Sequence, residues 1–192
     1  GKSTQIRKLA NRLKRQGQLP VIIREPGGTM LGERIRHILK TRNRTEISPL
    51  AELILFNASR SQLVGQVILP ALNDNRIVIC DRFTDSTVAY QSYGRGLDLE
   101  TVNRLNQIGS QSLKPSMTFL LDAPPEIGLS RKKNSSGDRF EREDLEFHQR
   151  VREGFLQLAA AEPQRWTVID TTIKPGDVAD LIWERFTRLT KS

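Results

Sequence analysis

Short apolar runs alternate with helical patterns along most of the chain, and this alternation most strongly limits the folds that it can adopt. The apolar runs lie at 19–23, 77–80, 117–121 and 167–169, and each is short and uninterrupted. Between them, apolar residues recur at the spacing of amphipathic helices. Helices are expected at 6–13, 31–39, 50–73, 98–111, 126–133, 143–162 and 177–189. Strands that are apolar throughout are buried on both faces, so we expect an α/β fold with a parallel sheet between two helical layers.

Composition excludes several classes of protein. The 192 residues include 37% hydrophobic residues, which is enough for a core. A single cysteine, Cys80, excludes an internal disulfide and a multi-cysteine zinc site, and two distant histidines argue against a histidine metal cluster. There is no apolar run of about 18–20 residues and no apolar leader. We therefore expect one domain over 1–192, located in the cytoplasm and without a membrane partner.

The positive charge is concentrated near the start of the chain. Residues 1–44 hold twelve Lys and Arg but only two acidic residues, in a chain of net charge +8. Such a basic segment is compatible with nucleic-acid binding. The alternative is a solvated helix face with a few phosphate-binding side chains. We favour the alternative, because residues 1–44 contain no aromatic residue for stacking on bases.

Gly1-Lys2-Ser3-Thr4 runs directly into an amphipathic helix and matches the second half of G-x-x-x-x-G-K-[ST]. In that loop backbone N–H groups hold phosphates, the lysine reaches the β- and γ-phosphates, and the hydroxyl after it binds Mg²⁺. The alternative is a basic residue at an ordinary helix start. Because such a loop normally follows a central strand, we expect about a dozen further upstream residues that supply this strand and the first glycine.

Three segments follow predicted strands, at 24–28, 81–83 and 122–124. Ligands of open parallel sheets bind beyond the carboxyl ends of the strands. These segments are therefore the first candidates for a binding site.

Four stretches together resemble bacterial thymidylate kinases. They are REPGGT at 24–29, ISPLAELILF at 47–56, DRFTDSTVAYQSYGRG at 81–96 and DRFEREDLEFHQRV at 138–151. The resemblance covers essentially the whole chain. It implies a phosphate-loop NTPase-type three-layer fold whose first strand is missing from this chain. It also implies transfer of the γ-phosphoryl group of ATP to dTMP with Mg²⁺, and a homodimer formed through helices.

Arg24 and Arg82 each follow a predicted strand and are suited to clamp the acceptor phosphate. The resemblance assigns them this role, and the alternative is a surface ion pair with Glu25 or Asp85. Asp81 ends its strand, where its carboxylate is expected to hold Mg²⁺ or its waters together with Ser3. A carboxylate that only caps the loop is the alternative for Asp81.

The resemblance assigns five residues to the nucleoside. Phe56 stacks on thymine, and Arg60, four residues later on the same helix face, reaches a base oxygen. Thr87 and Gln91 match positions that hydrogen-bond the base, while Tyr90 matches a residue near C2′ of the sugar. For Phe56 the alternative is core packing. The chain departs from the usual F-A-A-D-R pattern, because Asn57 and Ser59 replace an alanine and the acid before Arg60.

Residues 131–142 (RKKNSSGDRFER) form the most loop-like basic stretch of the chain and resemble the family's mobile lid. Arg139 is the first candidate for a catalytic arginine that contacts ATP, and Arg131 is the second. The alternative is a solvated charged loop.

The residues alone leave two other functions possible. One is a phosphate-loop kinase that acts on another nucleoside monophosphate, and the other is a non-catalytic protein that binds nucleotide or nucleic acid. Cys80 is expected to be a small buried hydrophobic residue and not a nucleophile. Trp166 and Trp183 are expected to serve packing.

Overall fold

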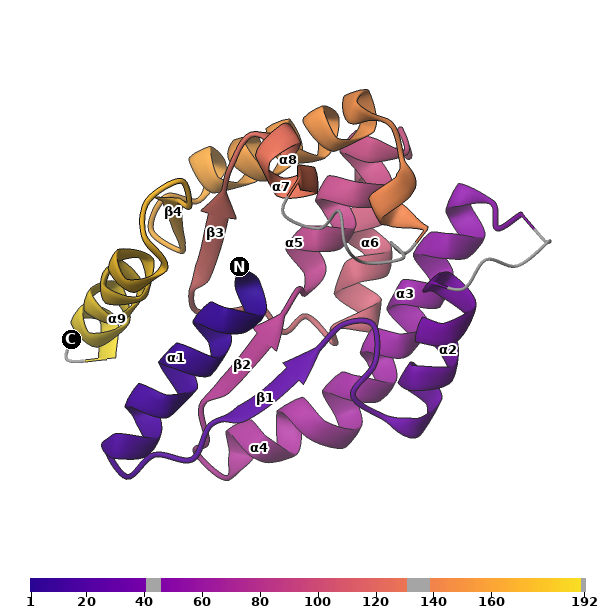
Figure 1. The fold of residues 1–192 in the computed structure, drawn as a ribbon. Coiled ribbons are helices and arrows are strands. Elements are labelled where there is room, and N and C mark those ends of the chain that lie inside the picture. Colours follow the sequence, from indigo (N-terminus) through magenta and orange to yellow (C-terminus); the bar gives the residue numbers. More distant parts are fainter. Residues whose placement is uncertain (41–45, 131–138, 191–192) are drawn as a thin grey trace.

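The computed structural model describes residues 1–40, 46–130 and 139–190 (Figure 1). The four strands are β1 (Val21–Arg24), β2 (Val78–Asp81), β3 (Thr118–Asp122) and β4 (Trp166–Asp170). The α-helices are α1 (Lys2–Arg15), α2 (Met30–Lys40), α3 (Pro49–Leu63), α4 (Leu69–Asn73), α5 (Thr84–Thr87), α6 (Leu99–Gly109), α7 (Pro125–Ser130), α8 (Leu145–Ala161) and α9 (Pro175–Thr190). The π-helical segments η1 (Val64–Ile68) and η2 (Val88–Gly94) and the 3₁₀ turn η3 (Phe140–Arg142) complete the described elements.

All strand pairing in the described residues is parallel, as the sequence predicts. β1 pairs with β2 from Val21–Val78 to Arg24–Asp81, and β3 pairs with β4 from Thr118–Trp166 to Asp122–Asp170. The sequence predicts one continuous sheet, whereas the described strands form two separate pairs. β2 and β3 each keep one edge open, and their side chains are half-buried along the whole strand. The strand that the sequence analysis expects upstream of residue 1 stays a prediction.

Local signals explain most helix ends. Gly17 adopts φ +79° directly after α1, a conformation that glycine accepts without a steric penalty. Ser48 caps α3, because its hydroxyl accepts from the Ala51 N–H at 3.3 Å and proline follows at the first helical position. Asp98 and Asp144 cap α6 and α8 in the same way. The predicted helix over 50–73 is confirmed as three joined pieces, α3, η1 and α4.

The first predicted strand is partly wrong. The strand begins at Val21 and not at 19, and Leu19 is 69% exposed. Ile22 is 48% exposed, so only Ile23 of β1 is buried, although the apolar run predicts a fully buried strand. β1 has a neighbour on one side only, since β2 is its single partner in the described residues. A second miss is the helical segment α5–η2, whose sequence lacks the apolar spacing of a helix.

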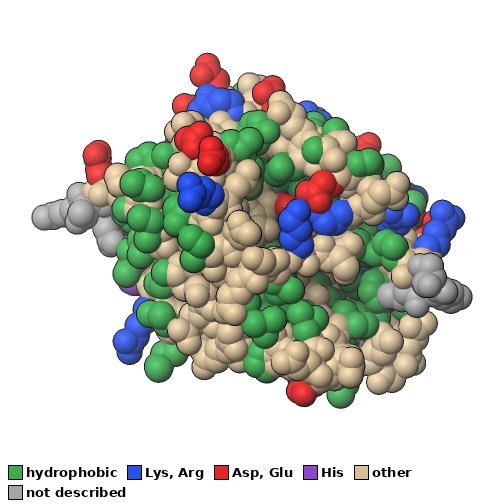
Figure 2. Space-filling view, turned by 180° about the vertical axis from the view of Figure 1, so that it is seen from behind, with side chains coloured by type: hydrophobic (Ala, Val, Ile, Leu, Met, Phe, Trp, Pro, Cys, Tyr) green, Lys and Arg blue, Asp and Glu red, His purple; other side chains and the backbone are tan. Residues whose placement is uncertain are grey.

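The helices pack beside the strands and against one another. α1 contacts β2 and α9, while α3 contacts α2 and α6. The amino end of α1 lies between the carboxyl ends of β2 and β3 (Figure 1). Within the described ranges, no helix is both long enough and apolar enough to cross a membrane. Charged side chains lie among hydrophobic ones on the face that Figure 2 shows.

Candidate active site

The register of β1 and β2 places predicted site residues side by side. Arg24 ends β1 directly opposite Asp81, which ends β2, and Arg82 follows at once. The amino end of α1, which carries Gly1 to Thr4, opens toward the same end of the strands (Figure 1). Two arginines and the amino end of a helix therefore lie at the carboxyl ends of β1 and β2. This arrangement is suited to binding anions.

Arg82 has an unusual backbone. Its φ of +72° lies in the left-handed region, which costs a residue with a Cβ about 1 kcal/mol or more. Its guanidinium lies 4.8 Å from the centre of the Tyr90 ring and donates to the Tyr90 hydroxyl at 3.0 Å. The predicted alternative was an ion pair with Glu25 or Asp85. Those carboxylates instead bind Arg60 and Arg165, respectively.

Arg24 forms an exposed ion pair with Glu33 at 3.3 Å. Glu33 also accepts from the Gly28 N–H at 3.0 Å, and this bond is the main reason that the pKa of its carboxyl is lowered. Gly28 has φ +80°, and a Cβ there would lie 2.8 Å from a methyl carbon of Leu63. Glu33 thus holds the glycine turn after β1 and the side chain of Arg24 together.

Asp81 carries a buried acceptor. Its Oδ1 has no hydrogen-bond partner among the described residues, which is costly for a buried carboxylate oxygen. The described residues contain no group of three or more His, Cys, Asp or Glu that could cage a metal. Mg²⁺ is usually held by one or two carboxylates together with phosphate oxygens, so a lone carboxylate with an unused oxygen fits that cation.

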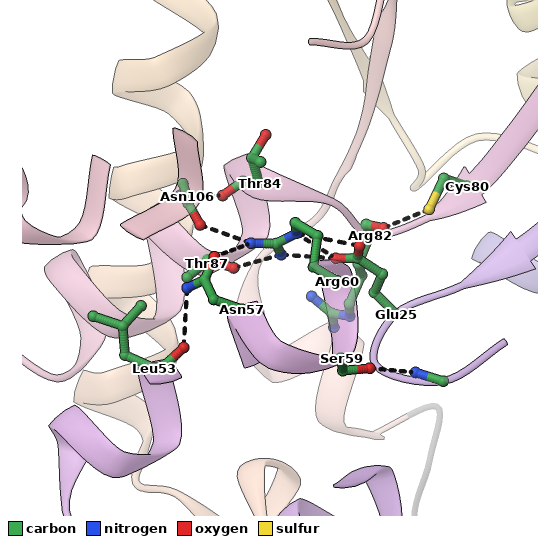
Figure 3. Close-up of polar contacts among 11 residues, drawn as sticks. Glu25, Leu53, Asn57, Ser59, Arg60, Cys80, Arg82, Thr84, Thr87 and Asn106 are labelled. Carbon is green, nitrogen blue, oxygen red and sulfur yellow. Dashed lines mark hydrogen bonds and ion pairs between the residues drawn. The ribbon is translucent and has the colours of Figure 1, made fainter. Parts of the chain in front are cut away.

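Arg60 is the centre of a buried polar network, which Figure 3 shows. Its side chain is 1% exposed and forms an ion pair with Glu25 at 2.7 Å. A guanidinium has five N–H groups. Here they meet the Glu25 carboxylate, the side-chain oxygens of Asn57 and Asn106, and the Thr87 hydroxyl. Arg60 would have to release one of these acceptors to reach a base oxygen, so its predicted role stays a prediction.

The network around Arg60 explains how the chain accommodates its departure from the F-A-A-D-R pattern. Asn57 accepts from Arg60 at 3.1 Å and donates to the carbonyl of Leu53 at 3.0 Å. Ser59 accepts from the Gly27 N–H at 3.2 Å (Figure 3). Burial raises the pKa of Glu25 while Arg60 opposes this shift. The support for Arg60 therefore comes from Asn57 and Glu25, without an acid at position 59.

The ring of Phe140 packs against two residues that the resemblance assigns to the nucleoside. The ring of Phe140 lies 5.8 Å from that of Phe56 and 6.0 Å from that of Tyr90. Phe140 therefore fills part of the space beside Phe56. Phe56 is half-buried and packs against Phe140, so both stacking on a base and core packing stay open for it.

A second buried carboxylate, Glu52, joins the base-side residues to the predicted lid. It is completely buried and accepts from the Gln91 amide at 2.8 Å and from Arg95 at 3.4 Å. Arg139 also forms an ion pair with it. Arg139 is thus tied to the core in this structure, whereas Arg131 lies outside the described residues.

The comparisons with known proteins agree with one another. The thymidylate kinase family model matches residues 1–182. The chain belongs to the thymidylate kinase family. It is 52% identical to thymidylate kinase of Synechococcus sp. (strain JA-3-3Ab) over 95% of this chain and 88% of the relative. Thymidylate kinase of Dehalococcoides mccartyi (strain 195) is 50% identical over 100% of this chain and 92% of the relative.

A solved structure supports the same family. The crystal structure of thymidylate kinase from Ehrlichia chaffeensis matches with a TM-score of 0.78 and 34% identity, over 98% of this chain and 92% of that chain. This match confirms the expected phosphate-loop NTPase fold.

Three residues of this candidate site are absent from the sequence-based candidates. Glu52, Asn106 and Phe140 contact candidate residues directly. A signal existed for Glu52, because it lies four residues before Phe56 and eight before Arg60, on one helix face. Asn106 offered no such signal, since it lies on α6, which is far from Arg60 in the sequence although it packs against α3. Cys80, as expected, is no nucleophile candidate, because burial raises the pKa of its thiol well above the usual range.

Proposed function

We propose that the protein transfers the γ-phosphoryl group of ATP to dTMP, giving dTDP and ADP. The observation that carries this proposal is the register of β1 and β2, which sets Arg24 opposite Asp81 and beside Arg82. Phosphoryl transfer depends mainly on positioning and on stabilisation of charge. Two arginines at the carboxyl ends of β1 and β2 can bind the acceptor phosphate. The amino end of α1, with Lys2, Ser3 and Thr4, can bind the phosphates of ATP.

Mg²⁺ is part of this proposal, with Asp81 and Ser3 as the residues that would hold it. The unpartnered Oδ1 of Asp81 supports the choice. When bound, the cation would neutralise charge on the phosphates of ATP. The side chains around it orient the reactants: Arg82 holds the acceptor phosphate, and Lys2 holds the donor phosphates.

The nucleoside would lie beside Phe56, with Thr87 and Gln91 toward the base edge. Thr87 and Gln91 are 2% and 1% exposed, so their polar groups are shielded from competing water. Tyr90 would border C2′ of the sugar and disfavour ribonucleotides. Because Phe140 fills part of this space, we expect its ring to shift when a base enters.

The test of this function is ADP release, coupled to NADH oxidation, with ATP·Mg²⁺ and a panel of dTMP, dUMP, UMP, CMP and AMP. We expect turnover with dTMP well above that with the others. A higher rate with another acceptor would reassign the substrate. Because the phosphate loop is expected to need the upstream strand and its first glycine, the panel is also run on a protein that carries them. Inactivity of that folded protein toward the whole panel would contradict the kinase proposal.

Arg139→Ala is expected to lower turnover more than tenfold while the affinity for dTMP changes little, because we assign Arg139 to the transferring phosphate and not to the nucleoside. Single-turnover kinetics together with calorimetric titration of dTMP would separate the two effects. Arg142→Ala is the matched control from the same segment. Equal turnover of Arg139→Ala and the unmodified protein would remove Arg139 from the mechanism.

We also propose that the protein forms a homodimer through α3 and α6, which contact each other. Ile54 and Ile108 on these helices are 50% and 72% exposed, and Ala51 and Ala58 lie on the exposed side of α3. Sedimentation velocity should give a dimer that Ala58→Arg converts to monomer. The cytoplasmic location and the single domain stay predictions.

A further inference from the structure

The position of Glu52 gives it a role that goes beyond an ordinary ion pair. It lies in the first turn of α3, is completely buried, and uses Oε1 to accept from the side-chain nitrogen of Gln91 at 2.8 Å. Arg95 and Arg139 form ion pairs with the same carboxylate. Gln91 itself is 1% exposed, so water does not compete for this contact.

We propose that Glu52 is a positioning residue that fixes the orientation of the Gln91 carboxamide and thereby sets which base edge the site accepts. This inference rests on the proposed function. A carboxylate only accepts hydrogen bonds, whereas a carboxamide has a donor end and an acceptor end. Turning the Gln91 amide by 180° would place its oxygen against the Glu52 oxygen in a buried site, which is unfavourable.

The fixed amide leaves an acceptor for a ligand. With its nitrogen bound to Glu52, Gln91 presents Oε1 as the acceptor end of its amide. Thr87 lies four positions earlier on the same helical segment and has the opposite polarity. Its oxygen already accepts from Arg60 at 2.7 Å, so its hydroxyl proton remains to be donated.

An acceptor from Gln91 and a donor from Thr87 complement the edge of thymine or uracil, where the N3–H group donates and the neighbouring carbonyl accepts. Cytosine presents the reverse polarity, with an unprotonated N3 and an amino group. A site that hydrogen-bonds one pattern rejects the other because buried groups are then left unpaired. Glu52 therefore sets discrimination against cytosine, and it has no direct part in discrimination between thymine and uracil, which differ by one methyl group.

The test compares kcat/KM for dTMP, dUMP and dCMP in the full chain and in Glu52→Gln, whose side chain can either donate or accept. We expect the dTMP-to-dCMP ratio to fall at least about tenfold, mainly through KM for dTMP, while the dTMP-to-dUMP ratio stays the same. Glu143→Gln is the matched control, because Glu143 also pairs with Arg95, at 2.7 Å, but does not contact Gln91. An unchanged dTMP-to-dCMP ratio in Glu52→Gln would overturn the proposal.

A double-mutant cycle separates positioning from a general structural effect. Gln91→Leu should lower the same ratio, and Glu52→Gln added to Gln91→Leu should lower it no further, since Glu52 acts through Gln91. A further drop in the double variant would contradict this role.

Side-chain amide exchange in the ¹⁵N-labelled unmodified protein gives an independent test that does not depend on activity. We expect one glutamine amide signal, absent from the spectrum of Gln91→Leu, to exchange slowly with solvent because Glu52 binds it. Fast exchange of that signal would overturn the proposal. If no acceptor is phosphorylated but exchange is slow, the proposed function fails and the orientation of Gln91 by Glu52 stands.

Discussion

Replacing Arg82 with alanine or with glycine is expected to lower kcat/KM for dTMP by about 10²–10³-fold, the size of effect seen when one preorganised donor to a reacting anion is lost. Both variants remove the guanidinium that we assign to the acceptor phosphate. Coupled kinetics with dTMP as the varied substrate measures the loss.

The two Arg82 variants should differ in stability. With φ at +72°, position 82 favours glycine over any residue with a Cβ. Arg82→Gly is therefore expected to unfold at a higher urea concentration than Arg82→Ala, by about 1 kcal/mol in the free energy of unfolding. Equal stability of the two variants would show that the backbone relaxes there, and near-normal activity of either would remove Arg82 from the clamp.

Arg60→Met is expected to destabilise the fold by about 3–5 kcal/mol, because it leaves the buried carboxylate of Glu25 without its cation. The pair is buried, with side chains 1% and 3% exposed, and Asn57, Asn106 and Thr87 also lose a donor. This loss is a large part of the stability of an ordinary domain. Urea unfolding followed by circular dichroism gives the free energy directly.

Two comparisons sharpen the Arg60 prediction. Arg104→Met, which removes an exposed pair with Glu100 whose side chains are 77% and 81% exposed, should change stability by about 0.5 kcal/mol or less. Glu25→Gln combined with Arg60→Met should recover part of the loss, since no buried charge is then unpaired. A cost below about 1 kcal/mol for Arg60→Met would show that the network does not hold these segments together.

The local elements were predictable where a short signal acts alone. Ser48 and Pro49 predict the start of α3, and Gly17 predicts the end of α1, because caps depend on one or two residues. β1 was less predictable, since the exposure of Ile22 depends on whether a strand or solvent lies beside it and not on its own sequence. The division of the strands into two pairs likewise depends on how the whole chain packs and not on the sequence of any one strand.

The candidate site was predictable as a set of residues but not as a set of contacts. Resemblance selected Arg60 and Gln91, and the structure brings both into buried hydrogen-bond networks. Which acceptor each one meets depends on Glu25, Glu52 and Asn106, which come from other segments. Sequence spacing identifies neighbours along one helix only. It therefore could not predict contacts with residues that come from another segment of the chain.

The network around Arg60 also limits how such a kinase can evolve. The Arg60 side chain binds residues from four segments: the loop after β1, α3, the end of α5, and α6. Most exchanges at position 60 would therefore be removed by selection for folding before any new base preference could arise. Changes in acceptor preference are therefore expected to accumulate first at Gln91, which is uncharged and makes no hydrogen bond to Arg60 among the contacts of this network.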